Sequence, residues 1–225
     1  MLNTITDGVW TVDDRFTAPG LSLPLRMTVL RLPSGGLLLY SPVPLSTETA
    51  DAIEALGAVE HIVAPSLLHH LHVGPAADRF SSAAVWGAPG LAKKRRDLTG
   101  LQELPAESPL EGVELVRIEG APMLQEVCML HQASRTMLCA DLVFNMHDVG
   151  GWFGSVFTWM TGTNGKLAMS RSWRMFSRQR SKTAESVGRV LDWAPEQVLM
   201  GHGEPLLDDA AAKLRAAVFI KPEGT

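Results

Sequence analysis

Residues 126–144 read EVCMLHQASRTMLCADLVF, and this stretch says most about the fold of the 225-residue chain. Two apolar runs, 126–130 and 136–140, flank the polar segment 131–135, a pattern typical of two antiparallel strands joined by a tight connection. If the turn is centred between Ala133 and Ser134, Glu126 faces Asp141 across the hairpin, with their Cβ atoms about 5 Å apart. We therefore predict a hairpin that ends in two neighbouring carboxylates.

Two carboxylates at that distance repel each other unless a metal ion or a shared proton joins them. Glu126 is thus a candidate metal ligand, a group that supports a ligand, or a general base; the alternative is an ordinary glutamate at the edge of a sheet. The same register pairs Cys128 with Cys139. We interpret both as buried small apolar residues rather than as a disulfide or a metal pair.

Further strands and helices are expected on both sides of this hairpin. Ser46 or Thr47 is expected to cap a helix that ends near Leu56, and Asp208 to cap the last helix. Because strands alternate with helices and one hairpin is present, we expect an α/β layered domain with a mixed sheet. The expected strands are 8–13, 26–32, 36–40, 61–64, 84–86, 114–118 and 197–200, and further helical stretches are expected up to 79 and from about 90.

Polar residues that can bind a metal follow three of the expected strands. His69 and His70 come after strand 61–64, Asp141 follows strand 136–140, and His202 follows strand 197–200. In layered α/β proteins, ligands collect outside the carboxyl ends of strands. Imidazoles together with a carboxylate suit Zn²⁺, Fe²⁺ or Mn²⁺. We therefore predict a metal site there, with His72 as a reserve ligand; the alternative is unrelated surface histidines and a helix-capping aspartate.

The composition argues against several classes of protein. The chain has 20 Lys and Arg against 24 Asp and Glu, a formal net charge of −4, which is the wrong sign for a general nucleic-acid binder. We find no signal peptide and no apolar run of the roughly 20 residues that a bilayer requires. We therefore expect a cytoplasmic protein without a nucleic-acid or membrane partner, a monomer or a homodimer.

Two motifs resemble those of the metallo-β-lactamase fold superfamily. Gly201-His202-Gly203 is similar to the superfamily's last metal histidine, and 139–142, Cys-Ala-Asp-Leu, resembles the strand end that provides its bridging aspartate. The resemblance covers nearly the whole chain. It implies one domain over residues 1–225, folded as a four-layer αββα sandwich of mixed sheets, with the site at one end of the two sheets.

The chain departs from the superfamily's hallmark motif, His-x-His-x-Asp-His. Counting back from the next strand aligns this motif with residues 65–70, PSLLHH, so that Pro65 and Leu67 stand at its first two histidines. This Pro-x-x-x-His-His variant is similar to a divergent, uncharacterised bacterial branch. The resemblance then implies that one of the two usual metal sites is lost, and that the other keeps His69, His70, Asp141 and His202.

From these observations we expect a metal-dependent hydrolase with a mononuclear site, acting on a small molecule with an ester, thioester or lactone-like carbonyl. The expected cofactor is one divalent ion, Zn²⁺ first, with Fe²⁺ or Mn²⁺ as alternatives. Asp141 and Glu126 would be the catalytic carboxylates, with Glu126 orienting or deprotonating the water. The alternatives are a non-catalytic scaffold that binds a ligand or partner, and a mononuclear non-haem iron oxygenase.

Overall fold

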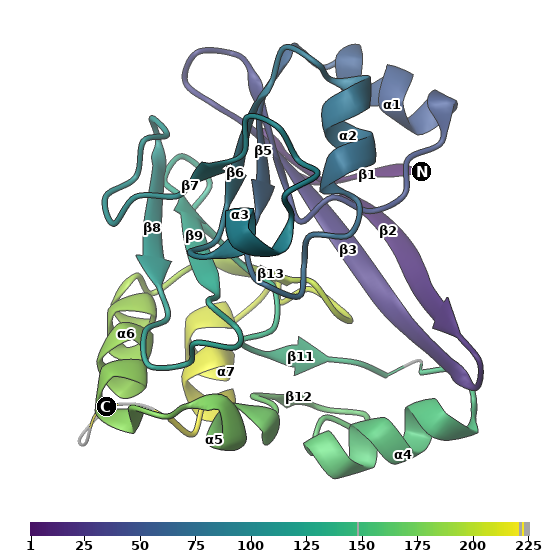
Figure 1. Cartoon of the computed structure of the whole chain (residues 1–225). Coiled ribbons are helices and arrows are strands. Elements are labelled where there is room, and N and C mark those ends of the chain that lie inside the picture. The colour runs from purple at the N-terminus through teal and green to yellow at the C-terminus, as the bar shows by residue number, and fades with distance from the viewer. Residues whose placement is uncertain (148, 221, 223–225) are drawn as a thin grey trace.

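The computed structural model describes residues 1–147, 149–220 and 222, and places two mixed sheets face to face (Figure 1). Seven strands form the first sheet in chain order. Neighbours are antiparallel through the first four strands and parallel from the fourth onward. These strands are β1 (Leu2–Thr6), β2 (Val9–Ala18), β3 (Leu21–Arg31), β4 (Leu37–Tyr40), β5 (Val59–Ala64), β6 (Ala84–Gly87) and β7 (Gln102–Glu103).

The second sheet contains the hairpin predicted from residues 126–144. Its order is β13-β10-β9-β8, and the hairpin register is the predicted one, since Thr136 pairs with His131 and Leu138 with Met129. β13 lies parallel to β10, whereas β9 is antiparallel to both of its neighbours. The bounds are β8 (Val113–Arg117), β9 (Val127–His131), β10 (Thr136–Cys139) and β13 (Gln197–Met200).

The central strands, such as β4 and β9, are almost continuously apolar because they are covered on both faces. Leu38 and Tyr40 of β4, like Met129 of β9, belong to the core between the two sheets, and Leu37 and Leu39 point to the other side. Helices α1 (Thr47–Glu54) and α2 (Val73–Arg79) cover the outer face of the first sheet. Helices α6 (Arg180–Asp192) and α7 (Ala210–Ala217) cover the second. The result is the expected four-layer αββα sandwich.

The β2–β3 hairpin runs well beyond the body of the first sheet and reaches helix α4 (Trp152–Thr161) (Figure 1). Its tip is bonded to the start of α4, since the Phe153 N–H donates to the Gly20 carbonyl at 3.0 Å, and Ser22 and Gly150 form a β-bridge. The predicted strands 8–13 and 26–32 therefore stopped short of this extension. The remaining short elements are α3 (Leu91–Lys94), β11 (Phe144–Asn145), β12 (Leu167–Ala168) and α5 (Ser172–Phe176).

The two predicted helix caps have different outcomes. Ser46 caps α1 as predicted, and its hydroxyl accepts the Thr49 N–H at 3.2 Å. The prediction for Asp208 was wrong: the residue before α7 is Asp209, which makes no side-chain cap, and the Asp208 carboxylate pairs with Lys213 at 2.6 Å. Among the described residues, every helix is too short or too polar to span a bilayer.

Candidate metal centre

His69 lies in the loop that follows β5 of the first sheet. Ser66 shapes this loop, because its hydroxyl accepts the backbone N–H groups of Leu68 at 3.1 Å and His69 at 3.0 Å. The loop is also joined to the second sheet, since the Val127 N–H donates to the Pro65 carbonyl at 2.8 Å. The Pro65–His70 segment therefore holds the imidazole of His69 at the end of the space between the two sheets.

Asp141 and His202 come from neighbouring parallel strands of the second sheet. Cys139 pairs with Met200 at the carboxyl ends of β10 and β13, and each candidate ligand stands two residues further along its chain. Because parallel strands end at the same edge of a sheet, this register brings the two side chains together. The predicted convergence of Asp141 and His202 is thus a direct result of strand pairing.

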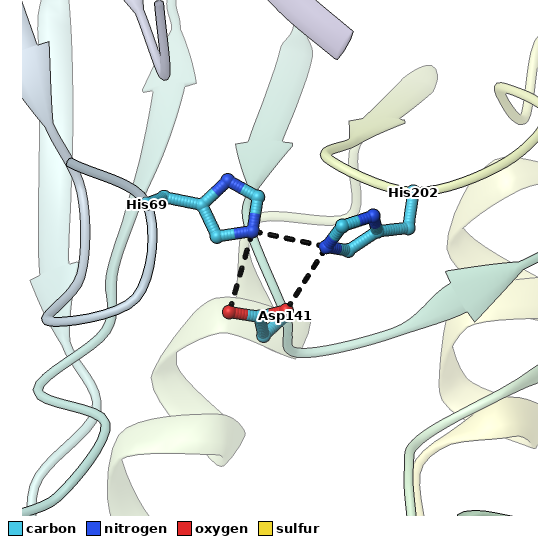
Figure 2. A group of neighbouring side chains, drawn as sticks. All are labelled: His69, Asp141 and His202. Atoms are coloured by element: carbon cyan, nitrogen blue, oxygen red, sulfur yellow. Dashed lines mark hydrogen bonds and ion pairs between the residues drawn. The ribbon is translucent and has the colours of Figure 1, made fainter. Parts of the chain in front are cut away.

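His69, Asp141 and His202 form a triangle of ligand atoms (Figure 2). The Nε2 atoms of His69 and His202 are 3.1 Å apart; His69 Nε2 is 3.5 Å from Asp141 Oδ2, and His202 Nε2 is 3.4 Å from Asp141 Oδ1. All three side chains are largely buried. Two ligand atoms on a tetrahedral Zn²⁺ are themselves about 3.3 Å apart, given bond lengths of about 2.0–2.1 Å. The spacing therefore fits one shared ion.

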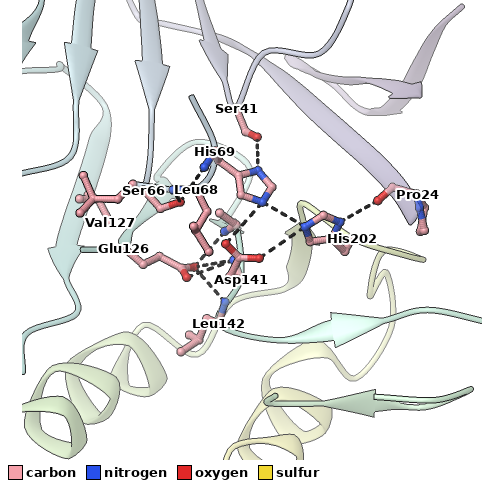
Figure 3. Close-up of polar contacts among 12 residues, drawn as sticks. Pro24, Ser41, Ser66, Leu68, His69, Glu126, Val127, Asp141, Leu142 and His202 are labelled. Atoms are coloured by element: carbon pink, nitrogen blue, oxygen red, sulfur yellow. Dashed lines mark hydrogen bonds and ion pairs between the residues drawn. The ribbon is translucent and has the colours of Figure 1, made fainter. Parts of the chain in front are cut away.

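The outer nitrogens of both imidazoles are already bonded (Figure 3). His202 Nδ1 donates to the Pro24 carbonyl at 2.7 Å, so a neutral His202 presents a lone pair at Nε2. His69 Nδ1 lies 2.8 Å from the Ser41 hydroxyl, which can accept its proton and leave His69 Nε2 free in the same way. Such outer partners fix the tautomer of metal-binding histidines. Sequence reasoning did not find Pro24 and Ser41, because both lie far from the ligands along the chain.

The carboxylate of Asp141 is also suited to bind a cation. Its Oδ2 is buried and makes no hydrogen bond among the described residues, since His69 Nε2 lies beyond the usual range of about 2.7–3.2 Å. Burial alone would raise the pKa of Asp141, but His69 and His202 lower it below its ordinary value. A buried, charged carboxylate oxygen that accepts no hydrogen bond is unfavourable without a positive partner. The donor set of two imidazoles and one carboxylate therefore suits a divalent ion, and three ligands leave a coordination position open.

Glu126 lies behind Asp141 rather than beside the histidines (Figure 3). Its Oε1 accepts the backbone N–H groups of Ala140, Asp141 and Leu142 at 2.9, 3.1 and 3.0 Å. The side chain has no exposed surface, and burial, together with the Asp141 carboxylate, raises the pKa of Glu126 to about 8. The predicted proximity of the two residues is present, but the Glu126 carboxylate is directed to the backbone that carries Asp141.

The two glycines beside His202 are explained by close packing. A Cβ on Gly201 would lie 2.7 Å from the His69 ring and 2.9 Å from the Ala140 carbonyl oxygen. Gly203 has a φ of +97°, and a Cβ there would collide with the backbone of Asn145. The Gly-His-Gly motif therefore lets two histidines from different sheets approach each other.

His70 and His72 are not part of this triangle. His70 is held by Arg95, whose guanidinium lies 3.2 Å from His70 Nδ1 and donates to the His70 carbonyl at 2.7 Å. Burial, followed by the charges of Lys94 and Arg95, lowers the pKa of His70. Burial likewise lowers the pKa of His72. Both side chains line the cavity in front of the triangle, and the predicted ligand role of His70 remains a prediction.

A cavity of about 600 Å³ opens in front of the triangle. His69, Asp141 and His202 form its polar end, and Ser41 lies beside them. Glu126 is not among its described lining residues. The volume lies within the range of about 300–1,000 Å³ that is usual for small-molecule sites. The triangle is thus accessible to a ligand of that size.

Comparisons with known proteins support the architecture. A family model described as a domain of unknown function (DUF4336) matches residues 6–92. A search of curated proteins found no match. A metallo-β-lactamase from Hirschia baltica has a similar structure, with a TM-score of 0.66 and 12% sequence identity over 99% of this chain and 98% of that one.

Two further solved structures agree with the first. A metallo-β-lactamase from Pontibacter korlensis gives a TM-score of 0.62 at 12% identity, covering 96% of this chain and 98% of that one. The mono-zinc form of the metallo-β-lactamase FIM-1 from Pseudomonas aeruginosa gives 0.63 at 14% identity, covering 97% and 96%. The chain therefore has the metallo-β-lactamase fold, and within it a His/Asp cluster that can hold a metal ion.

Proposed function

We propose that this protein is a metal-dependent hydrolase with a single-ion site, acting on a small molecule that carries an ester, thioester or lactone-like carbonyl. The observation that supports this most strongly is the triangle of His69, Asp141 and His202 at the polar end of a cavity, with a buried Asp141 oxygen that accepts no hydrogen bond from the described residues. The positions of Pro65 and Leu67 support one ion rather than two, since neither side chain can bind a metal.

At these residues a divalent cation would supply Lewis acidity and lower the pKa of a water molecule to about 7. His69 and His202 would hold it through Nε2, with tautomers fixed by Ser41 and the Pro24 carbonyl. Asp141, kept charged by its lowered pKa, would complete the set of three ligands through Oδ2. Glu126 would hold the backbone of Asp141 in place rather than take the water's proton.

The donor set also supports a second candidate. Two histidines and one carboxylate on one side of an open site are the ligands of mononuclear non-haem iron oxygenases. The metal that the protein contains, and its consumption of O₂ with a bound substrate, distinguish the oxygenase from the hydrolase. Iron content with oxygen uptake would favour the oxygenase, and zinc content with ester cleavage would favour the hydrolase.

The first test is the metal content of protein purified without chelators or metal-affinity resin. We expect about one equivalent of Zn, Fe or Mn in the wild type and its loss in Asp141→Ala and His202→Ala. His70→Ala tests the fourth predicted ligand: retained metal would place His70 outside the coordination sphere. His61→Ala is a control, since His61 accepts a hydrogen bond from Trp86 away from the site. A folded wild type that stays empty after reconstitution would refute the enzyme and support a binding scaffold.

A further inference from the structure

The cavity in front of the metal centre has mostly apolar walls. Leu23 and Leu25 of β3 form one side and Phe144 lies next to the triangle. The other walls are mostly apolar and come from the β2–β3 tip, the loop after β5, α4 and α5. They include Leu68, Phe153, Val156, Met160, Trp173 and Phe176. Thr161, Ser170 and Ser172 also line the cavity and are polar but uncharged.

Charged groups are rare in this lining. Asp141 is the only carboxylate among the described lining residues, and no lysine or arginine is among them. Arg95, which contacts His70 just outside, is already paired with Asp97 at 2.6 Å. A ligand with a carboxylate or phosphate inside the cavity would therefore find no cation except at the metal centre. This excludes the salt bridges by which anionic ligands are usually held.

Helix α4 turns apolar side chains toward the mouth of the cavity. Residues 149–165 contain no charged residue. Within α4, Gly154 and Thr158 are buried, whereas Val156 and Met160 line the cavity and remain 43% and 63% exposed. A surface helix ordinarily buries its large apolar residues and exposes its polar ones. The reversed arrangement in α4 leaves an apolar surface at the entrance that a ligand can cover.

We infer that this cavity binds an uncharged aliphatic chain, and that the site acts on esters or thioesters of such acyl groups. The chain would lie between β3, α4 and α5, with its carbonyl at the His69, Asp141 and His202 end. The part of this inference that concerns catalysis rests on the proposed hydrolase function. The part that concerns binding rests on the lining alone.

The binding test uses methyl ketones from hexan-2-one to dodecan-2-one, which carry a carbonyl but cannot be hydrolysed. Their dissociation constants are measured by isothermal titration calorimetry on the purified protein, with and without added Zn²⁺. Because each buried methylene contributes about 0.8 kcal/mol, we expect affinity to rise roughly fourfold per carbon until the cavity is filled. Dissociation constants that do not change with chain length would overturn the inference.

Two neighbouring positions on α4 give a matched pair of variants. Val156→Asp puts a charge into the lining, and we expect it to weaken decan-2-one binding at least tenfold. Ser155→Asp adds the same charge to an exposed residue that is not among the described lining residues, and should change binding less than twofold. Equal effects of the two substitutions would count against the inference.

Leu23→Trp provides a readout that a folding defect cannot imitate. A larger side chain in the wall should lower the chain length at which affinity stops rising, while short ketones still bind. If light scattering instead shows a dimer that Val156→Asp dissociates, and ketones do not bind, the α4 surface is an interface between copies and the inference fails.

Hydrolysis is measured separately, with p-nitrophenyl esters of two to twelve carbons on the metal-loaded protein. Chain-length-dependent ketone binding without ester cleavage would retain the cavity assignment and refute the hydrolase. Cleavage of short esters at rates that do not depend on chain length would support the hydrolase and refute the assignment of the cavity to an aliphatic chain.

Discussion

At the scale of single residues, the candidate centre depends on groups that do not touch the ion themselves. Ser41 is buried, has a φ of +56°, and places its hydroxyl against His69 Nδ1. A positive φ is uncommon for serine. This backbone conformation is what places the Ser41 hydroxyl beside the His69 ring. Glu126 has a comparable role on the other side, where it supports the backbone of Asp141.

Ser41→Ala should weaken metal binding by about 10- to 100-fold, because His69 loses the partner that fixes its tautomer. Competition for Zn²⁺ with a coloured chelator measures this change. The free energy of unfolding of the metal-free protein should fall by no more than about 1.5 kcal/mol, the worth of one hydrogen bond. Unchanged affinity would show that the hydroxyl does not orient the imidazole.

Glu126→Ala should destabilise the protein by about 3 kcal/mol or more, because three buried N–H groups lose their acceptor. Glu126→Gln should cost less, since an amide oxygen can still accept at the Oε1 position. Urea unfolding of both variants measures the difference. If Glu126→Gln were instead as stable as the wild type but inactive, the general-base role expected from the sequence would be restored.

At the scale of elements, the site depends on where strands end. The hairpin register was predictable because its apolar runs and polar connection are both unambiguous, and it placed Glu126 near Asp141. That His69, and not the adjacent His70, lies in the triangle was not predictable, since adjacent residues in an irregular loop carry no periodicity. The β2–β3 extension was also missed, because Asp13, Asp14 and Pro24 interrupt the apolar pattern of those strands. β11 and β12, two residues each, are too short to give any pattern.

Gly201→Ala tests the close approach at the end of β13. The added Cβ would press on the His69 ring, so we expect loss of most metal binding while the far-ultraviolet circular dichroism spectrum is kept. Gly165→Ala is the control: its φ of +60° makes alanine strained, but no atom lies within 4 Å of the new Cβ. That variant should lose about 1 kcal/mol of stability and no metal. Equal metal content in both variants would contradict the packing argument.

At the scale of the whole molecule, the two sheets are joined by a buried histidine as well as by apolar packing. His131 of β9 lies with Nε2 3.0 Å from the Arg31 carbonyl of β3 and with Nδ1 2.7 Å from the Ser134 hydroxyl. Both contacts are satisfied by the neutral ring. Burial lowers the pKa of His131 below its ordinary value of 6.5. The position of His131 at the turn places it too far from Asp141 to share an ion, but the sequence gives no sign that it bridges the sheets.

The protein should lose stability as the pH falls below about 6.5, because the unfolded chain then binds a proton that the folded His131 does not. Each such proton changes the slope of unfolding free energy by about 1.4 kcal/mol per pH unit. His131→Gln should remove up to one bound proton from this balance, so that between pH 5 and 6.5 the unfolding free energy changes less steeply with pH, by up to about 1.4 kcal/mol per pH unit. Chemical denaturation across this range measures it, and a slope identical to the wild type would exclude His131 as a source.

The candidate ligands come from both sheets, His69 from the loop after a strand of the first and Asp141 and His202 from the ends of strands of the second. The two histidines lie 133 positions apart along the chain. The segment matched by the family model, residues 6–92, contains only the first of them. During synthesis at roughly 5–20 residues per second, His69 is added to the chain about 7–27 seconds before His202. Metal binding at this centre would therefore have to follow synthesis of the second sheet, because a nascent or truncated chain that ends before His202 lacks a candidate ligand.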